Sequence, residues 1–206
     1  MNETIHTFLT DLSGKAPTPG GGGASALLGA VGASLASMVA SLTSGKKKYA
    51  DYQADIERIL GDTASLRDEL EALIDRDAEA FAPLAAAYGI PKDAPGRDET
   101  LEAALHAAAE VPLEILQTVC RVTPILEELM EKGSKLAISD VGVAAAACRA
   151  AAQGAALNVY INTKLMKDRV YAADLDMQTA TLAQQADERL SAVYTQVNCQ
   201  LRGIKR

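Results

Sequence analysis

The sequence predicts an all-α protein, a single-domain bundle of about six helices that spans residues 1–206. Three observations indicate this fold class. Almost every segment repeats its apolar residues at steps of three and four, and none shows the alternation of a strand. Hydrophobic residues make up 49% of the chain and aromatic residues only 4%, so the core is built from Ala, Leu, Val and Ile. A chain of 206 residues is long enough for one domain with a sizeable core.

The first three helices follow from the spacing of apolar residues. A short helix contains Ile5, Phe8 and Leu12 and ends near Gly14. An uncharged run then opens with four glycines and predicts a second helix over residues 22–44. The third helix covers residues 50–88 and carries one apolar stripe. The stripe consists of Ile56, Ile59, Leu66, Leu70, Leu73, Phe81 and Leu84.

The second half of the chain predicts three more helices. The fourth starts near Asp98, follows a heptad-like apolar seam and ends at Gly133. Pro112 lies within it and should bend it, because proline removes a backbone donor and clashes with the preceding turn. The fifth helix runs from about residue 139 to 165 and the sixth from about residue 175 to 201. Glycines and prolines over residues 89–96 indicate the turn between helices three and four.

Composition excludes several classes of protein. The net charge of −7 argues against a nucleic-acid partner, which requires a basic surface. The three cysteines are far apart and form no CxxC, so we expect neither disulfides nor a zinc site, and a reducing compartment. The two histidines are isolated, so no metal site is expected. The first residues carry acids rather than a basic signal region, so we expect a cytoplasmic protein.

The uncharged run between Ala16 and Gly45 is longer than the roughly 20 residues that a bilayer requires. It begins with four glycines, however, and contains five serines further on. Small residues recur at Ala26, Gly29 and Ala33, which allows another helix to approach closely. We therefore expect no membrane partner, and a helix that is buried on nearly all sides.

The glycine run itself is open to two interpretations. It formally satisfies GxGxxA, but no strand precedes it and lysines stand where a dinucleotide site needs an acid. No GK[ST] follows, so it is not a Walker A loop. Uncovered N–H groups at a helix N-terminus can hold a carboxylate, a phosphate or a polarised carbonyl. The alternative is that the glycines only form a tight turn after Pro19.

Several polar residues stand at unexpected positions. Asp77 continues the apolar stripe of the third helix, where a carboxylate is costly unless it is paired or used, so it acts on a ligand or caps a neighbouring helix. Ser139 is the expected N-cap of the fifth helix, and Asp140 in its first turn suits the helix dipole. Asn158 and Asn162 lie one turn apart and can bind a polar heterocycle or, the favoured interpretation, a second helix.

Lys46, Lys47 and Lys48 follow the second helix. Cations are favourable near a helix C-terminus, and such a run is usually a solvated face. The functional alternative is an electrostatic hook for the acidic tail of a substrate.

Four segments, in order over nearly the whole chain, resemble the cyclodeaminase/cyclohydrolase family of folate enzymes. They are PTPGGGGASALLGAVGASLASMVASLTSGKKKY (17–49), IDRDAEAF (74–81), GSKLAISDVGVAA (133–145) and QGAALNVYINTKLMKD (153–168). The chain is most similar to the stand-alone methenyltetrahydrofolate cyclohydrolases of this family. One departure is GSK at residues 133–135, where GN is common in the family.

The resemblance implies an all-α homodimer or higher oligomer, with a folate site near the subunit interface and neither a metal nor a cofactor beyond tetrahydrofolate. The implied reaction is hydrolysis of 5,10-methenyltetrahydrofolate to 10-formyltetrahydrofolate. The alternatives are a formimidoyltetrahydrofolate cyclodeaminase that releases ammonia, or a non-catalytic helical module that binds folate. Asp77, Asp140 or a desolvated lysine would be the catalytic base. The substrate would be bound by Pro19, Gly20, Gly21, Gly22, Gly23, Ser25, Lys46, Lys47, Lys48, Ser139, Asn158 and Asn162.

Overall fold

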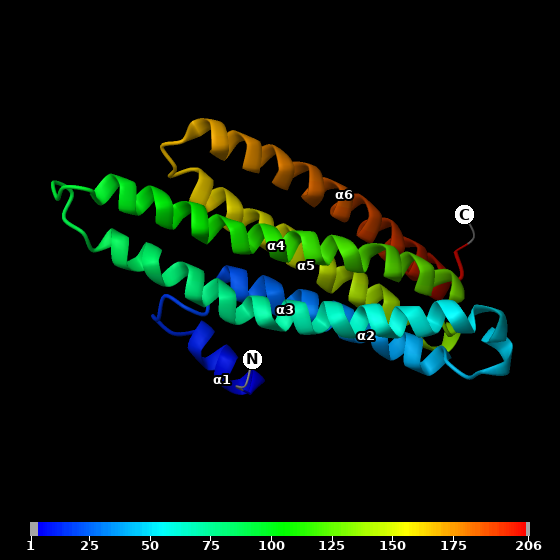
Figure 1. Ribbon diagram of the computed structural model, residues 1–206. Helices are drawn as coiled ribbons and strands as arrows, with labels where there is room; N and C mark the ends of the chain where they lie inside the picture. Colours follow the sequence, from blue (N-terminus) through cyan, green and yellow to red (C-terminus); the bar gives the residue numbers. More distant parts are fainter. Residues whose placement is uncertain (1–3, 205–206) are drawn as a thin grey trace.

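The computed structural model describes residues 4–204, and all of their regular structure is helical (Figure 1). Six α-helices are joined by short connections, two of which contain a 3₁₀ turn. The elements are α1 (Ile5–Leu12), α2 (Gly21–Thr43), η1 (Lys47–Tyr52), α3 (Gln53–Tyr88), α4 (Arg97–Lys132), η2 (Lys135–Ala137), α5 (Ile138–Thr163) and α6 (Arg169–Leu201). The predicted fold class, an all-α bundle of six helices, is confirmed.

The five long helices lie side by side along one direction (Figure 1). Helix α2 packs between α3 and α5, α4 packs on both α3 and α5, and α6 covers α5 and α4. The larger core lies among these five helices. A smaller core lies near the α3–α4 turn and contains Leu84, Leu105, Met166 and Leu175, among others.

Small residues allow α2 and α5 to approach closely. A Cβ atom at Gly32 would lie 2.3 Å from Cys148 Sγ, and one at Gly154 would lie 2.4 Å from Ser25 Oγ. Since Gly32 meets Cys148 while Ser25 meets Gly154, the two helices run antiparallel. The predicted helix–helix contact at Ala26, Gly29 and Ala33 is confirmed, since all three residues are buried.

Three helix starts differ from the prediction. Helix α6 begins at Arg169 rather than near residue 175, because the side chain of Asp168 accepts hydrogen bonds from the N–H groups of Val170 and Tyr171 and caps the helix there. Ser139 is not the N-cap of α5: Ala137 occupies that position and Ser139 is exposed within the helix. The predicted third helix begins as the 3₁₀ turn η1 and becomes α-helical at Gln53.

Helix α2 is less buried than expected. Its buried residues face α3, α4 and α5, but Leu28, Val31, Met38 and Leu42 expose between 39% and 46% of their surface. The helix is long and apolar enough to cross a membrane by length and composition, whereas half of its most apolar window is buried inside the bundle. The expectation of burial on nearly all sides is therefore wrong for one face of this helix.

Candidate active site

A pocket of about 170 Å³ lies where α2 begins, between α3, α4 and α5. Its lining combines backbone from the glycine run, one carboxylate, two amides and several apolar side chains. The residues are Pro17, Thr18, Gly20, Gly21, Gly22, Asp77, Phe81, Ala108, Pro112, Asn158, Ile161 and Asn162. The structure thus brings the predicted residues Gly20–Gly22, Asp77, Asn158 and Asn162 together around one cavity.

The glycines allow the α2 N-terminus to lie directly against two polar side chains. The N–H of Gly23 donates a 2.9 Å hydrogen bond to Asp77 Oδ2. A Cβ atom at Gly22 would lie 2.1 Å from Asp77 Oδ1, and one at Gly21 would lie 2.9 Å from Asn158 Nδ2. The first N–H groups of a helix have no acceptor within the helix. Asp77 accepts from the N–H of Gly23, whereas the N–H groups of Gly21 and Gly22 have no acceptor within residues 4–204 and are available to a ligand in the pocket.

Asp77 is a half-buried carboxylate, and two opposing effects act on its pKa. Burial raises the pKa of its carboxyl group above the ordinary value, and the hydrogen bond from the Gly23 N–H opposes that rise only in part. A raised pKa makes the ionised carboxylate a better proton acceptor. Of the two interpretations of Asp77, the hydrogen bond from the Gly23 N–H confirms the helix cap, and the ligand-binding role stays a prediction for a carboxylate that lines the pocket.

Asn158 and Asn162 lie on the face of α5 that turns toward the pocket. Asn158 Nδ2 donates to the Gly154 carbonyl at 2.8 Å, within its own helix. Asn162 Nδ2 donates to the Asn158 carbonyl at 2.8 Å and to the Ala108 carbonyl of α4 at 3.0 Å. Within residues 4–204, no donor reaches either side-chain amide oxygen. Asn162 therefore joins two helices, and both amide oxygens are available to a polar ligand.

The remaining lining of the pocket was not predicted as part of the site. Phe81, Pro112 and Ile161 supply apolar surface beside Asp77 and the two amides. Phe81 was predicted as part of the apolar stripe and of the family segment 74–81, and Pro112 as a bend in the fourth helix. A proline inside a helix leaves the carbonyl four residues earlier without its N–H partner. Pro112 within a helical pattern was therefore the available signal that a donor from another helix contacts the Ala108 carbonyl.

Three predicted binding residues, Pro19, Gly23 and Ser25, lie beside the pocket rather than in its lining. Pro19 precedes the glycines at the entry to α2. Ser25 is buried, donates its hydroxyl to the Gly21 carbonyl at 2.7 Å and faces Gly154 of α5. Its observed contacts hold α2 against α5.

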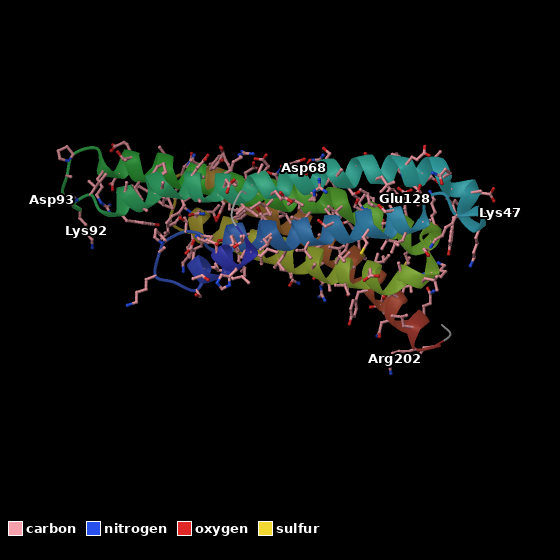
Figure 2. All side chains as sticks on the ribbon, turned by 90° about the horizontal axis from the view of Figure 1, so that it is seen from below. Lys47, Asp68, Lys92, Asp93, Glu128 and Arg202 are labelled. Atoms are coloured by element: carbon pink, nitrogen blue, oxygen red, sulfur yellow. The ribbon has the colours of Figure 1, made fainter. Side chains whose placement is uncertain are left out.

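A second cluster of predicted residues lies at the other end of α2. Lys46, Lys47 and Lys48 follow its C-terminus, about 30 Å from the pocket at the 1.5 Å rise per helical residue. Figure 2 shows Lys47 at the end of the bundle opposite the turn that carries Lys92 and Asp93. Ser139 and Asp140 stand in the first turn of α5, at this same far end. The structure therefore divides the predicted site between the two ends of the α2–α5 pair.

The far cluster is an ordered arrangement of polar groups. Tyr49 Oη accepts a 3.0 Å hydrogen bond from the Lys135 N–H, and Lys48 Nζ lies 5.5 Å from the centre of the tyrosine ring. The Lys135 N–H lowers the pKa of the Tyr49 phenol, nearby lysine charges add to this effect, and burial opposes it. Lys46 Nζ lies 3.4 Å from the hydroxyl of Ser134, which is a buried residue. The N–H of Ser134 donates a hydrogen bond to Thr43 Oγ1.

Among residues 4–204, no group of three or more His, Cys, Asp and Glu side chains is arranged to hold a metal ion. The pocket instead offers what a cationic, polar heterocycle needs. Asp77 supplies negative charge, the amides supply hydrogen-bond acceptors, and the α2 N-terminus supplies donors.

Comparisons with known proteins identify the family of the chain. The family model described as formiminotransferase-cyclodeaminase matches residues 4–181. The chain is 42% identical to a methenyltetrahydrofolate cyclohydrolase of Methylorubrum extorquens over 95% of this chain and 96% of that protein. It is 32% identical to the formimidoyltransferase-cyclodeaminase of Rattus norvegicus, of which it spans 36%.

A solved structure extends the similarity to three dimensions. The formiminotetrahydrofolate cyclodeaminase of Thermotoga maritima superposes with a TM-score of 0.84 at 32% identity, over 98% of both chains. The match therefore covers the pocket, the far cluster and all six helices of the bundle. The chain belongs to the formiminotransferase-cyclodeaminase family.

Proposed function

We propose that this protein hydrolyses 5,10-methenyltetrahydrofolate to 10-formyltetrahydrofolate, in a reversible reaction. The observation that carries the proposal is the 42% identity to a methenyltetrahydrofolate cyclohydrolase along nearly the whole of both chains. That similarity is supported by a pocket in which a carboxylate, two amides and a helix N-terminus converge.

The chemistry assigns a role to each group. The substrate is a cation whose charge is spread over N5, the bridging carbon and N10, and Asp77 would stabilise that charge. Asp77 also accepts a proton as water adds to the bridging carbon, which its raised pKa favours. The bond from this carbon to N5 then breaks, N5 takes up a proton, and the formyl group stays on N10. One proton is released overall.

The polar pocket lining would orient the pterin ring. The oxygens of Asn158 and Asn162 accept from its amino and N–H groups, while Phe81 and Pro112 cover its face. We further infer a folate substrate without any other cofactor, a cytoplasmic location, a homodimer or higher homo-oligomer, and neither a nucleic-acid nor a membrane partner.

A second candidate activity is supported by the other relatives. The Thermotoga maritima protein is a formiminotetrahydrofolate cyclodeaminase, and it is similar over 98% of this chain. Such an activity closes the same ring on formimidoyltetrahydrofolate and expels ammonia. The same pocket would suit it, because the two reactions share methenyltetrahydrofolate as substrate or product.

The deciding experiment follows the absorbance of methenyltetrahydrofolate after addition of purified protein, with formimidoyltetrahydrofolate assayed in parallel. Rapid decay of the methenyl absorbance with no ammonia from the second substrate is the expected result. Ammonia release with accumulation of the methenyl form would establish the cyclodeaminase instead. Rates equal to the buffer blank for both substrates would leave a non-catalytic folate-binding module.

A further inference from the structure

The pocket at the start of α2 is closed on one side by the chain that precedes this helix. Pro17 and Thr18 line it there, whereas the rest of the lining comes from the start of α2 and from α3, α4 and α5. Its volume of about 170 Å³ lies below the roughly 300–1,000 Å³ of pockets that bury a drug-sized ligand. Entry of a folate therefore requires the pocket to widen, so that one of its walls must move.

The walls of the pocket differ in how firmly they are held. Helices α2 to α5 pack on one another around the larger core, and moving one of them would disrupt that close packing. Pro17 and Thr18 belong instead to an irregular connection, in which residues 13–17 are exposed and residues 18–20 are half-buried. The connection is therefore the wall that can move at the lowest cost.

Helix α1 and this connection have few ties to the bundle, and we refer to residues 4–19 as the strap. Among the residues that the structure describes, every hydrogen bond of the strap stays inside α1 and the turn after it. Figure 1 shows α1 as a separate short helix outside the five long ones. Apolar contact therefore has to hold the strap in place.

Phe8 provides most of that contact. Within Ile5–Leu12 it is the one fully buried side chain, and it joins the larger core, while Leu12 packs partly against the same core. Helix α1 has eight residues, and a helix of that length is not stable by itself in water. Withdrawal of one aromatic side chain therefore releases the whole of α1, at a much lower cost than unfolding of the bundle.

We propose that the strap opens to admit a folate and closes over it, with Phe8 as the positioning residue that fixes the closed state. In the closed state Pro17 and Thr18 cover the ligand that lies beside Asp77. The hydroxyl of Thr18 has no hydrogen-bond partner in the described part of the chain, so it is available to that ligand. The inference rests on the proposed function, since it takes a folate as the occupant of the pocket.

The first test is amide hydrogen exchange of the wild-type protein, followed by mass spectrometry. In the free protein, the amides of α1 should exchange at least a hundredfold faster than those at the centre of α2. A saturating equilibrium mixture of methenyltetrahydrofolate and 10-formyltetrahydrofolate should slow the exchange of α1 at least tenfold. Helix α6 contributes nothing to the pocket lining and is the internal control, so its exchange should stay unchanged.

Two results of this experiment would overturn the strap. Exchange of α1 as slow as that of α2 in the free protein would show that the strap does not open. Unchanged exchange of α1 at substrate concentrations that saturate turnover would show that it does not close over the ligand. A wild-type protein without turnover is a different outcome, because it contradicts the proposed function, whereas fast exchange of α1 would still support a strap that opens.

The second test removes the anchor and measures KM and kcat separately. Phe8→Ala should raise KM at least tenfold and leave kcat within a factor of about two, because Asp77 and the two amides stay on the long helices. Phe8→Leu keeps part of the apolar contact and should give an intermediate KM. Leu9→Ala truncates a neighbouring side chain that is 52% exposed, and this control should match the wild type.

The kinetic test also has results that would contradict the proposal. An unchanged KM in Phe8→Ala would show that the anchor has no part in substrate binding. A lowered kcat together with faster hydrogen exchange throughout α2 to α5 would show that Phe8 supports the bundle as a whole. In that case the strap is an ordinary part of the core and does not open separately.

Discussion

Asp77 is the residue on which the chemistry of the pocket depends. It stands on the apolar stripe of α3, where an ionised carboxylate is destabilising unless it is bound. The glycine run supplies one hydrogen bond and no steric hindrance, so the carboxylate stays close to the α2 N-terminus. A residue that lowers the stability of the fold at its own position is typical of a functional site.

Asp77→Asn should therefore separate activity from stability. We expect turnover of methenyltetrahydrofolate to fall by about 10²- to 10⁴-fold, as for loss of a general base. Asp75→Asn, on an exposed face of the same helix, is the matched control and should stay within a factor of about two. Full activity in Asp77→Asn, measured by the absorbance decay, would remove this carboxylate from the mechanism.

The pKa of Asp77 also predicts two pH effects. Because its pKa is raised in the folded protein, the folded state binds the proton more tightly than the unfolded state. Its contribution to stability is therefore greatest at low pH and declines as pH rises through the folded pKa. Asp77→Asn should raise the melting temperature at pH 7, and it should abolish the acid limb of the kcat/KM profile. A lowered melting temperature would contradict the burial argument.

Gly22 tests the close approach of α2 to Asp77. Gly22→Ala would place a methyl group 2.1 Å from Asp77 Oδ1 and must displace the carboxylate, so we expect at least a tenfold loss of kcat/KM. Gly61→Ala on α3 meets nothing within 4 Å and is the control. It should keep full activity and stabilise the protein by up to about 1 kcal/mol, because alanine favours the helix. Equal activity in both variants would contradict a steric role for Gly22.

At the scale of helices, α4 and α5 are joined by a hydrogen bond that a proline makes available. Pro112 has no N–H to donate to the Ala108 carbonyl one turn earlier. Asn162 Nδ2 of α5 donates to that carbonyl instead, at 3.0 Å. Helix α4 therefore passes Pro112 without ending, and the amide is fixed at the wall of the pocket.

A double-mutant cycle should measure the energetic coupling between Pro112 and Asn162. Asn162→Ala leaves the Ala108 carbonyl without a partner and should lower the free energy of unfolding by about 1–3 kcal/mol. In a Pro112→Ala background the helix supplies its own N–H, so the same change should cost less. Asn158→Ala is the control, since its side chain donates only within α5. Urea denaturation of the wild type, the two single variants and the double variant gives the coupling energy. Additive effects of the two changes would contradict the coupling.

The ends of the helices were harder to predict than their existence. The apolar periodicity of α6 becomes clear only near Leu175, but Asp168 starts the helix by accepting two N–H groups that no apolar pattern reveals. At α5, the preceding turn η2 continues into the helix, so Ser139 lies inside it instead of capping it. Capping side chains and the preceding turn set the first residue of a helix, whereas the apolar pattern becomes visible only inside it. The position of a helix end therefore depends on the path of the chain before the helix.

At the scale of the whole molecule, α2 and α5 approach each other closely where small residues face one another. Gly32 allows Cys148 of α5 to lie against α2, and the thiol is fully buried. Burial raises the pKa of Cys148 to about 12. Cys120 and Cys199 are only half-buried.

Thiol labelling should therefore report global unfolding. At pH 8 and without denaturant, we expect at most two of the three cysteines to react with a small disulfide reagent, because Cys148 has neither access nor thiolate. All three should react in concentrated denaturant. In Cys148→Ser, the thiol that reacts only in denaturant should be missing, which would identify it as Cys148. Rapid reaction of three thiols in the native protein would show that α2 and α5 separate without unfolding.

The sequence by itself determined the fold class, the six helices, the glycine run and the unexpected carboxylate at Asp77. Helical periodicity and small residues are local properties, so they predict each helix and its ability to pack closely. The anomaly of Asp77 was also visible, because a charge on an apolar stripe breaks a local pattern.

Only the tertiary structure decided which of the candidate residues meet. Asp77, Asn158 and Asn162 come together because α5 runs antiparallel to α2 and places its C-terminal half at the glycines. Lys46 and Asp140 lie at the other end, since a 23-residue helix is rigid and about 35 Å long. The exposure of Leu28, Val31 and Met38 was likewise invisible, because sequence shows that a residue is apolar and not which neighbours cover it.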